Sequence, residues 1–155
     1  MRQRLNRAFF KGFARLHTRL LVRTRGRPSS LGPRRTFLVL ETTGRRTGRP
    51  RSIVLLYMPE GDAFVVLASN YGQEHPPAWW RNLEARPDAL VHLSGRTIPV
   101  RARALAGDER QAVVAKAVQY NPQWQGYVRT LRRELPVVLL EPVAPGLTSP
   151  PSPPA

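Results

Sequence analysis

Residues 36–58, TFLVLETTGRRTGRPRSIVLLYM, contain the pattern that decides the fold of this chain. An apolar and β-branched run at Thr36–Thr42 predicts one strand, and a similar run at Ser52–Met58 predicts a second. The segment TTGRRTGRPR, residues 42–51, joins the two runs, and its two glycines permit a tight loop. The stretch therefore predicts two strands that meet at a strongly basic loop.

The remaining sequence adds short strands first and helices later. The turn residues Pro-Glu-Gly-Asp at 59–62 lie between the run at Ser52–Met58 and another at Ala63–Ala68, which predicts a hairpin. The further elements that we expect are a helix at 77–85, strands at 89–93 and 97–105, a helix that Asp108 caps, a helix at 123–133 and a strand at 136–141. This order favours an α+β antiparallel barrel over an alternating βαβ sheet.

The positive charge is concentrated at the N-terminus. The formal net charge is +15, and residues 1–35 hold ten Arg, one Lys and no acidic side chain. Apolar residues in this segment recur at intervals of three and four, which predicts an amphipathic helix followed by a linker. The helix could bind an anionic membrane surface through residues 1–23 or cap the open end of the barrel at 36–142. The proline-rich residues 143–155 have little to bury, so we expect a disordered tail.

The composition excludes several kinds of site. The chain has no cysteine, so it can form no disulfide framework, iron–sulfur cluster or thiolate metal site, and redox chemistry would need a bound cofactor. Its three histidines lie in different expected elements, and we expect no metal site. No apolar run is long enough for a membrane-spanning helix, so we expect a cytoplasmic protein. The sequence contains no GxGxxG or Walker loop for a nucleotide.

The basic loop at residues 42–51 is the most specific chemical feature of the sequence. Four arginines and three threonine hydroxyls surround the two glycines, whose loop could point its backbone N–H groups in one direction. Arginine side chains bind phosphate or carboxylate oxygens through paired charge-assisted hydrogen bonds. The loop therefore suits an anionic ligand, although its composition alone also fits an exposed, soluble hairpin loop.

Two later segments accompany this loop, LASNYGQEHPPAWWRNLEARPD at 67–88 and NPQWQGY at 121–127. In content, order and spacing, the three segments resemble the deazaflavin-dependent nitroreductase family, over roughly residues 37–142. The resemblance implies an FMN-binding-like split β-barrel that holds coenzyme F-420, an 8-hydroxy-5-deazaflavin. Contacts to the cofactor tail would come from Arg45, Arg46, Thr47 and Arg51, and the rest of the site from Val54, Leu55, Leu56, Ala68, Ser69, Asn70, Trp79, Trp80 and Asn82. Relatives often have lysine where Asn70 stands, so this chain has one charge fewer near the phosphate.

The tryptophans and tyrosines also admit a purely structural interpretation. Trp79 and Trp80 are consecutive in an expected helix and point about 100° apart, so one can pack in the core while the other lines a cleft. Trp124 and Tyr127 are three residues apart and share a helical face, which the residue pattern alone would place in the core. The resemblance instead implies that this face covers the substrate side of the cofactor.

The resemblance further implies a reaction. Reduced F-420 would transfer a hydride from carbon 5 of its central ring to an electron-poor small molecule, such as a quinone, a nitroaromatic or an unsaturated lipid. We expect Trp124 to form the wall on which the acceptor stacks. Tyr127, or a water near it, is expected to donate a proton to the reduced acceptor.

Three other functions fit parts of the sequence. FMN could occupy the same barrel, although the loop offers more positive charge than its single phosphate needs. A non-catalytic carrier of a flavin, a lipid or a haem degradation product would keep the fold without turnover. A nucleic-acid-binding module would account for the basic N-terminus, but the aromatic residues are not interleaved with the arginines, so we expect no nucleic-acid partner.

Overall fold

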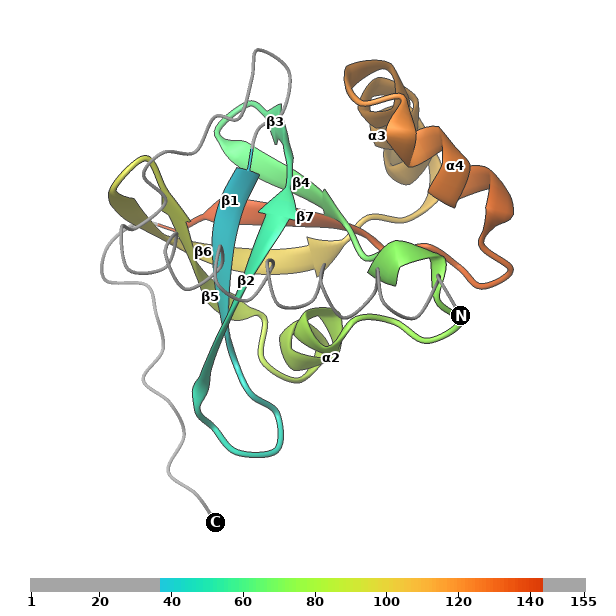
Figure 1. Cartoon of the computed structure of the whole chain (residues 1–155). Helices are drawn as coiled ribbons and strands as arrows, with labels where there is room; N and C mark the ends of the chain where they lie inside the picture. Colours follow the sequence, from blue (N-terminus) through green and yellow to red (C-terminus); the bar gives the residue numbers. More distant parts are fainter. Residues whose placement is uncertain (1–36, 144–155) are drawn as a thin grey trace, which may run out of the picture.

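An antiparallel sheet of seven strands organises residues 37–143, the part of the chain that the computed structural model describes (Figure 1). The strands are β1 Phe37–Thr43, β2 Pro50–Leu56, β3 Met58–Glu60, β4 Ala63–Leu67, β5 Asp88–Leu93, β6 Arg96–Ala104 and β7 Val137–Pro142. Their order across the sheet is β2-β1-β5-β6-β7-β4-β3. β2 and β3 lie at opposite ends of this order although only Tyr57 separates them in the chain, so the sheet must curl into an open barrel.

Three helices and one short turn accompany the sheet. They are the 3-10 turn η1 Asn70–Gly72, α2 Ala78–Ala85, α3 Gly107–Tyr120 and α4 Gln123–Thr130. α3 and α4 pack on each other at one side of the barrel, whereas α2 packs on β1 (Figure 1). No helix within residues 37–143 has the length and apolar character needed to cross a membrane.

β4 and β7 are buried on both faces, which explains their continuous apolar sequences. Val66 of β4 belongs to the cluster that fills the barrel, and its neighbours Val65 and Leu67 belong to a second cluster under α3 and α4. The first cluster includes Leu38, Leu40, Val91, Val100, Leu140, Trp79 and Leu83, and the second includes Val113, Ala117, Trp124, Val137 and Leu139. Each fully buried aliphatic side chain stabilises the fold by about 1.5–3 kcal/mol. The β4–β7 pair thus joins the two cores.

The expected α+β split barrel is confirmed, with three local corrections. The run at Ser52–Met58 is not one strand, because the chain leaves β2, which pairs with β1, and enters β3, which pairs with β4. Asp108 does not cap α3; it lies in the first turn, after Ala106 at the cap, where its carboxylate is favourable near the positive end of the helix. α4 ends at Thr130 rather than at residue 133, because Leu131 has extended backbone. The helix and linker expected within residues 1–35 lie outside the described residues, and so does the tail expected at 143–155 except for Val143, whose N–H donates to Pro99 O at 3.0 Å.

Tyr57 should be essential for closing the barrel. Its buried ring packs edge-on against Phe64, with ring centroids 5.3 Å apart, and burial, with a smaller effect of Tyr120, raises the pKa of its phenol. Tyr57→Ala should lower the free energy of unfolding by about 3–5 kcal/mol in urea denaturation, because it leaves a cavity at the junction. Tyr57→Phe should cost far less, and exposed Val128→Ala should change stability by less than about 0.5 kcal/mol. Equal losses for Tyr57→Phe and Tyr57→Ala would show that the hydroxyl, rather than the ring, holds the junction.

Candidate active site

The loop between β1 and β2 is closed by its own backbone. The Gly44 N–H donates to Arg49 O at 2.9 Å, and the Gly48 N–H donates to Gly44 O at 2.7 Å. Gly48 has a left-handed φ of 66°, and a Cβ added to Gly44 would lie 3.0 Å from Thr47 Oγ1. The glycines are therefore required by the turn itself and by the close approach of its two sides.

The side chain of Asn82 fixes this loop to α2. Its Nδ2 donates to Thr42 Oγ1 at 3.0 Å, and its Oδ1 accepts a hydrogen bond from the Arg45 N–H at 3.2 Å. Asn82 is 5% exposed and Thr42 is 2% exposed, so both residues are largely buried. The Thr42 hydroxyl in turn donates to Arg51 O at 3.4 Å. A short buried chain of hydrogen bonds thus connects α2, β1 and β2.

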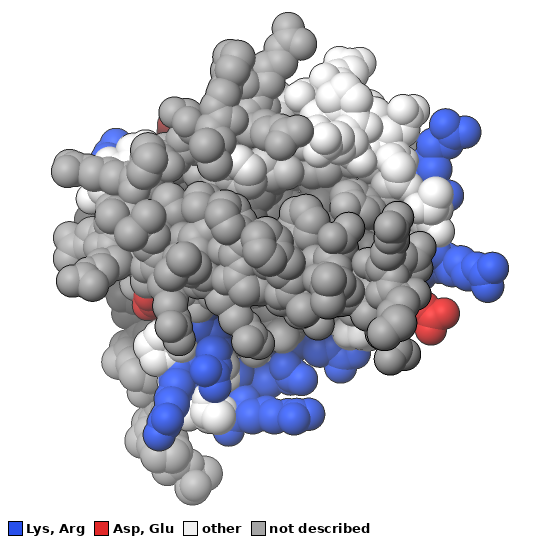
Figure 2. Space-filling view, viewed as in Figure 1, with Lys and Arg blue, Asp and Glu red and all other residues white. Residues whose placement is uncertain are grey.

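These bonds change the expected chemistry of the loop. Four of its backbone N–H groups, those of Gly44, Arg45, Gly48 and Arg49, donate within the protein. They are not free to converge on a ligand as the sequence suggested. The loop instead offers its arginine side chains, which Figure 2 shows as a cluster of basic groups at the lower edge of the molecule.

A cavity of about 320 Å³ opens between this loop and α2. Six residues proposed from the sequence line it, namely Arg45, Arg46, Thr47, Arg51, Trp79 and Asn82. None of the acidic residues that the structure describes contributes to its wall, and Arg49 of the same loop lies outside it. The cavity is therefore suited to an anionic group. We call it the basic cavity.

A second cavity, of about 250 Å³, lies along β2 and beneath α4. The expected site residues that line it are Val54, Leu55, Leu56, Ser69, Asn70, Trp79, Trp124 and Tyr127. Ile53 and Trp79 line both this apolar cavity and the basic cavity. Trp79 is 5% exposed and packs in the barrel core, so it is a fixed wall common to the two. An elongated ligand with an anionic end and a flat apolar end fits this arrangement.

Two of the expected site residues do not reach either cavity. Ala68 is 0% exposed, and its N–H donates to Pro136 O within the protein. Trp80 packs partly against the same barrel core as Trp79, and Trp79 also lines both cavities, so the expected division of roles between the two tryptophans is wrong. The described acidic and histidine side chains form no group of three that could hold a metal ion.

The structure adds a residue, Tyr71, that the sequence did not single out. Tyr71 lies in η1 and lines the apolar cavity, although 83% of it is exposed. Its φ of 55° is left-handed, a conformation that costs a residue other than glycine roughly 1–2 kcal/mol. Asn-Tyr-Gly in the sequence could have been recognised as a turn, but no local signal shows that the turn borders a cavity.

The structure also adds Arg133, which supports that turn from a distant part of the chain. Its Nη2 donates to Ala68 O at 3.0 Å and to Ser69 O at 3.1 Å, and its Nε donates to Gln73 O at 3.0 Å. Arg133 is more than fifty residues away in sequence, so no sequence pattern could have revealed this contact. Its side chain fixes the segment that supplies Ser69 and Asn70 to the apolar cavity.

Asn70 lines the apolar cavity, and its side chain also makes hydrogen bonds within the protein. Its Nδ2 donates to His75 O at 3.0 Å and to Gln73 Oε1 at 3.4 Å. The amide therefore stabilises the turn in which it lies, and Asn tolerates the left-handed φ of 47° better than most residues.

A model of the F-420H(2)-dependent quinone reductase family matches residues 13–142 of this chain. The chain belongs to this family. It is 31% identical over 140 residues to the F-420H(2)-dependent quinone reductase Rv1261c of Mycobacterium tuberculosis, covering 88% of this chain and 87% of that protein. The expected oxidoreductase class and the F-420 cofactor are thereby confirmed.

Two solved structures agree with this assignment. An F-420-H₂-dependent reductase is 29% identical, with a TM-score of 0.62 over 68% of this chain and 93% of that chain. A structure described as a domain-swapped dimer is 27% identical, with a TM-score of 0.65 over 84% of this chain and 98% of that chain. The curled sheet of this quinone reductase family member thus has close counterparts among known structures.

The buried Asn82–Thr42 pair should be energetically coupled. Asn82→Ala should lower the free energy of unfolding by about 1–3 kcal/mol, because it leaves the Arg45 N–H and the Thr42 hydroxyl without their partner. Thr42→Val should also destabilise the protein, but the double variant should lose less than the two single losses combined. Urea denaturation of the four proteins measures this coupling. Strict additivity would contradict the proposed connection between α2 and the loop.

Proposed function

We propose that this protein transfers hydride from reduced coenzyme F-420 to a quinone, in one site formed by the basic and apolar cavities. The observation that carries the proposal is their shared wall, Ile53 and Trp79, which places the arginine side chains of the loop next to an apolar space. When bound, the reduced cofactor supplies a hydride from carbon 5 and a proton, and the quinone takes up both equivalents to become a quinol. The protein must position the two molecules and exclude water between them.

The cofactor tail would bind in the basic cavity. F-420 carries a phosphodiester and a polyglutamate tail, and Arg45, Arg46 and Arg51 offer three guanidinium groups to their oxygens. A hydrogen bond between charged groups contributes roughly 1.5–3 kcal/mol. This excess of positive charge favours F-420 over FMN, which has a single phosphate. Asn82 would act by holding the Arg45 backbone, because both ends of its amide are already bonded within the protein.

The deazaflavin ring and the acceptor would occupy the apolar cavity. Val54, Leu55 and Leu56 form its β2 wall, and Trp124 and Tyr127 approach from α4. Trp124 is 5% exposed, so its ring is held by the second core and can act as a rigid stacking wall. The Tyr127 hydroxyl is our candidate for delivering the proton to the reduced acceptor, and its phenolate would be reprotonated by the proton that the cofactor loses on oxidation.

We further propose that the enzyme works in the cytoplasm, at the inner face of the cell membrane. Residues 1–23 combine an apolar stripe with basic side chains, and each basic group near an anionic surface adds about 1 kcal/mol of attraction. A lipid-soluble quinone could then reach the apolar cavity directly from the membrane. This segment lies outside the described residues, so the proposal rests on its sequence alone.

Arg46→Ala should weaken the binding of F-420 about tenfold to a hundredfold in a fluorescence titration. The reason is the loss of one charge-assisted contact of roughly 1.5–3 kcal/mol, at about 1.4 kcal/mol per tenfold. Arg49→Ala is the matched control, because Arg49 belongs to the same loop but lines neither cavity. Both variants should keep the parent's urea midpoint. Equal weakening by both substitutions would show that the loop attracts F-420 only through its total charge. Unchanged affinity in Arg46→Ala would show that the cofactor tail binds outside the basic cavity.

Tyr127→Phe should slow quinone reduction at least tenfold while leaving the F-420 dissociation constant within about twofold. The substitution keeps the ring in the apolar cavity and removes only the hydroxyl that we assign to proton delivery. Single-turnover kinetics with pre-bound reduced cofactor would measure the chemical step. Val128→Ala, exposed on the same helix α4 and outside both cavities, provides the control. An unchanged rate in Tyr127→Phe would show that solvent, rather than the Tyr127 hydroxyl, protonates the reduced acceptor.

A further inference from the structure

The turn η1 contains three consecutive residues with left-handed backbone. The φ angles are 47° at Asn70, 55° at Tyr71 and 77° at Gly72. Glycine adopts this conformation freely and asparagine tolerates it, whereas an aromatic residue rarely does. Strain of this kind persists where the surrounding structure enforces it, and it is concentrated at ligand-binding sites. Tyr71 is thus the residue whose position in η1 calls for a functional explanation.

The surroundings of η1 do enforce this conformation. Arg133 donates to the carbonyl oxygens of Ala68 and Ser69 on one side of the turn and to Gln73 O on the other. The Asn70 amide donates across the turn to His75 O. The backbone adds bonds from the Gly72 N–H to Ser69 O at 2.9 Å and from the Gln73 N–H to Asn70 O at 3.1 Å. The Tyr71 backbone is therefore held in place on both sides.

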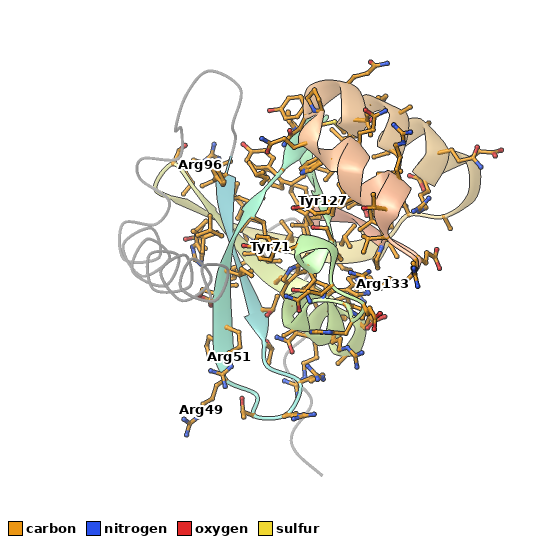
Figure 3. The ribbon with its side chains drawn as sticks, turned by 45° about the vertical axis from the view of Figure 1, so that its right-hand side comes forward. Arg49, Arg51, Tyr71, Arg96, Tyr127 and Arg133 are labelled. Atoms are coloured by element: carbon orange, nitrogen blue, oxygen red, sulfur yellow. The ribbon has the colours of Figure 1, made fainter. Side chains whose placement is uncertain are left out.

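The Tyr71 side chain lies at the exposed rim of the apolar cavity. It lines this cavity together with Tyr127, yet it is 83% exposed and belongs to neither core cluster. η1 lies beside α4, and a Cβ added to Gly72 would lie 4.0 Å from Tyr127 Cδ1 and Cε1. Figure 3 shows Tyr71 and Tyr127 in the same region, one on η1 and the other on α4. An exposed ring at the rim of an apolar cavity lacks a partner on its outer face.

We propose that Tyr71 is a specificity-determining residue that stacks on the acceptor and makes the site select fused-ring quinones over single-ring quinones. The inference rests on the proposed function, since it concerns the acceptor of the same site. A flat fused ring would cover the exposed Tyr71 face, and stacked aromatic pairs are favoured beyond the apolar area that they bury. A smaller, single-ring quinone covers less of that face. The rigid turn then adds affinity without the cost of ordering a mobile loop.

The test measures acceptor binding without turnover. The protein is saturated with oxidised F-420, and 2-methyl-1,4-naphthoquinone or tetramethyl-1,4-benzoquinone is titrated by calorimetry. Tyr71→Asn removes the ring while keeping a residue that tolerates the left-handed backbone, and Tyr71→Gly is a second ringless variant. Tyr71→Phe keeps the ring. Val128→Ala is the control, because Val128 is exposed on α4 but lines neither cavity.

We expect both ringless variants to weaken naphthoquinone binding about fivefold to thirtyfold, and to bring its affinity close to that of the benzoquinone. Tyr71→Phe and Val128→Ala should bind both quinones within about twofold of the parent, and all variants should bind F-420 equally well. Unchanged naphthoquinone affinity in the ringless variants, or an equal loss in Tyr71→Phe, would overturn the role of the ring while the proposed function stands. Failure of the parent protein to bind F-420 would instead overturn the proposed function, and this inference with it.

Discussion

The structure depends on one connection, the single residue Tyr57 between strands at the two ends of the sheet. A flat sheet could not place β2 and β3 so far apart in strand order and so near in the chain. The resulting curl encloses the first core and leaves a seam between β2 and the segment that follows β4. The apolar cavity lies at this seam, since Val54 and Leu55 come from one side and Ser69 and Asn70 from the other. The curvature of the sheet therefore creates the space in which we place the chemistry.

The candidate site also depends on the separation of its charged side chains from its apolar surface. The Asn82 amide binds both Thr42 and the Arg45 backbone, so the loop position is fixed by a neutral group at the buried end of the basic cavity. No carboxylate among residues 37–143 lines that cavity beside its arginine side chains, which suits an anionic tail. Trp79 completes the division, because its buried ring borders both the charged and the apolar space.

Much of this could be predicted from the sequence, for physical reasons that differ from residue to residue. Alternation, apolar runs and turn residues act locally, so the strands and the basic loop were predictable within a few positions, and three separated motifs together identified the family. The break between β2 and β3 at Tyr57 was not predictable, because Ser52–Met58 is one continuous apolar run in the sequence. Bonds between distant residues left no local pattern either, as with the Arg133 contacts to Ala68 and Ser69. Backbone donors that seemed available in the loop are satisfied within the protein, by hydrogen bonds that only the folded structure reveals.

The measurement that tests the central claim most directly compares two ligands at increasing salt: intact F-420 and its deazaflavin chromophore without the phosphodiester and glutamate tail. If one site combines a basic and an apolar cavity, intact F-420 should bind far more tightly at low ionic strength. Its advantage should shrink as salt screens the arginines, while the affinity of the tail-less chromophore stays nearly constant. Equal affinities at low salt, or an advantage that salt does not reduce, would contradict the assignment of the tail to the arginine loop.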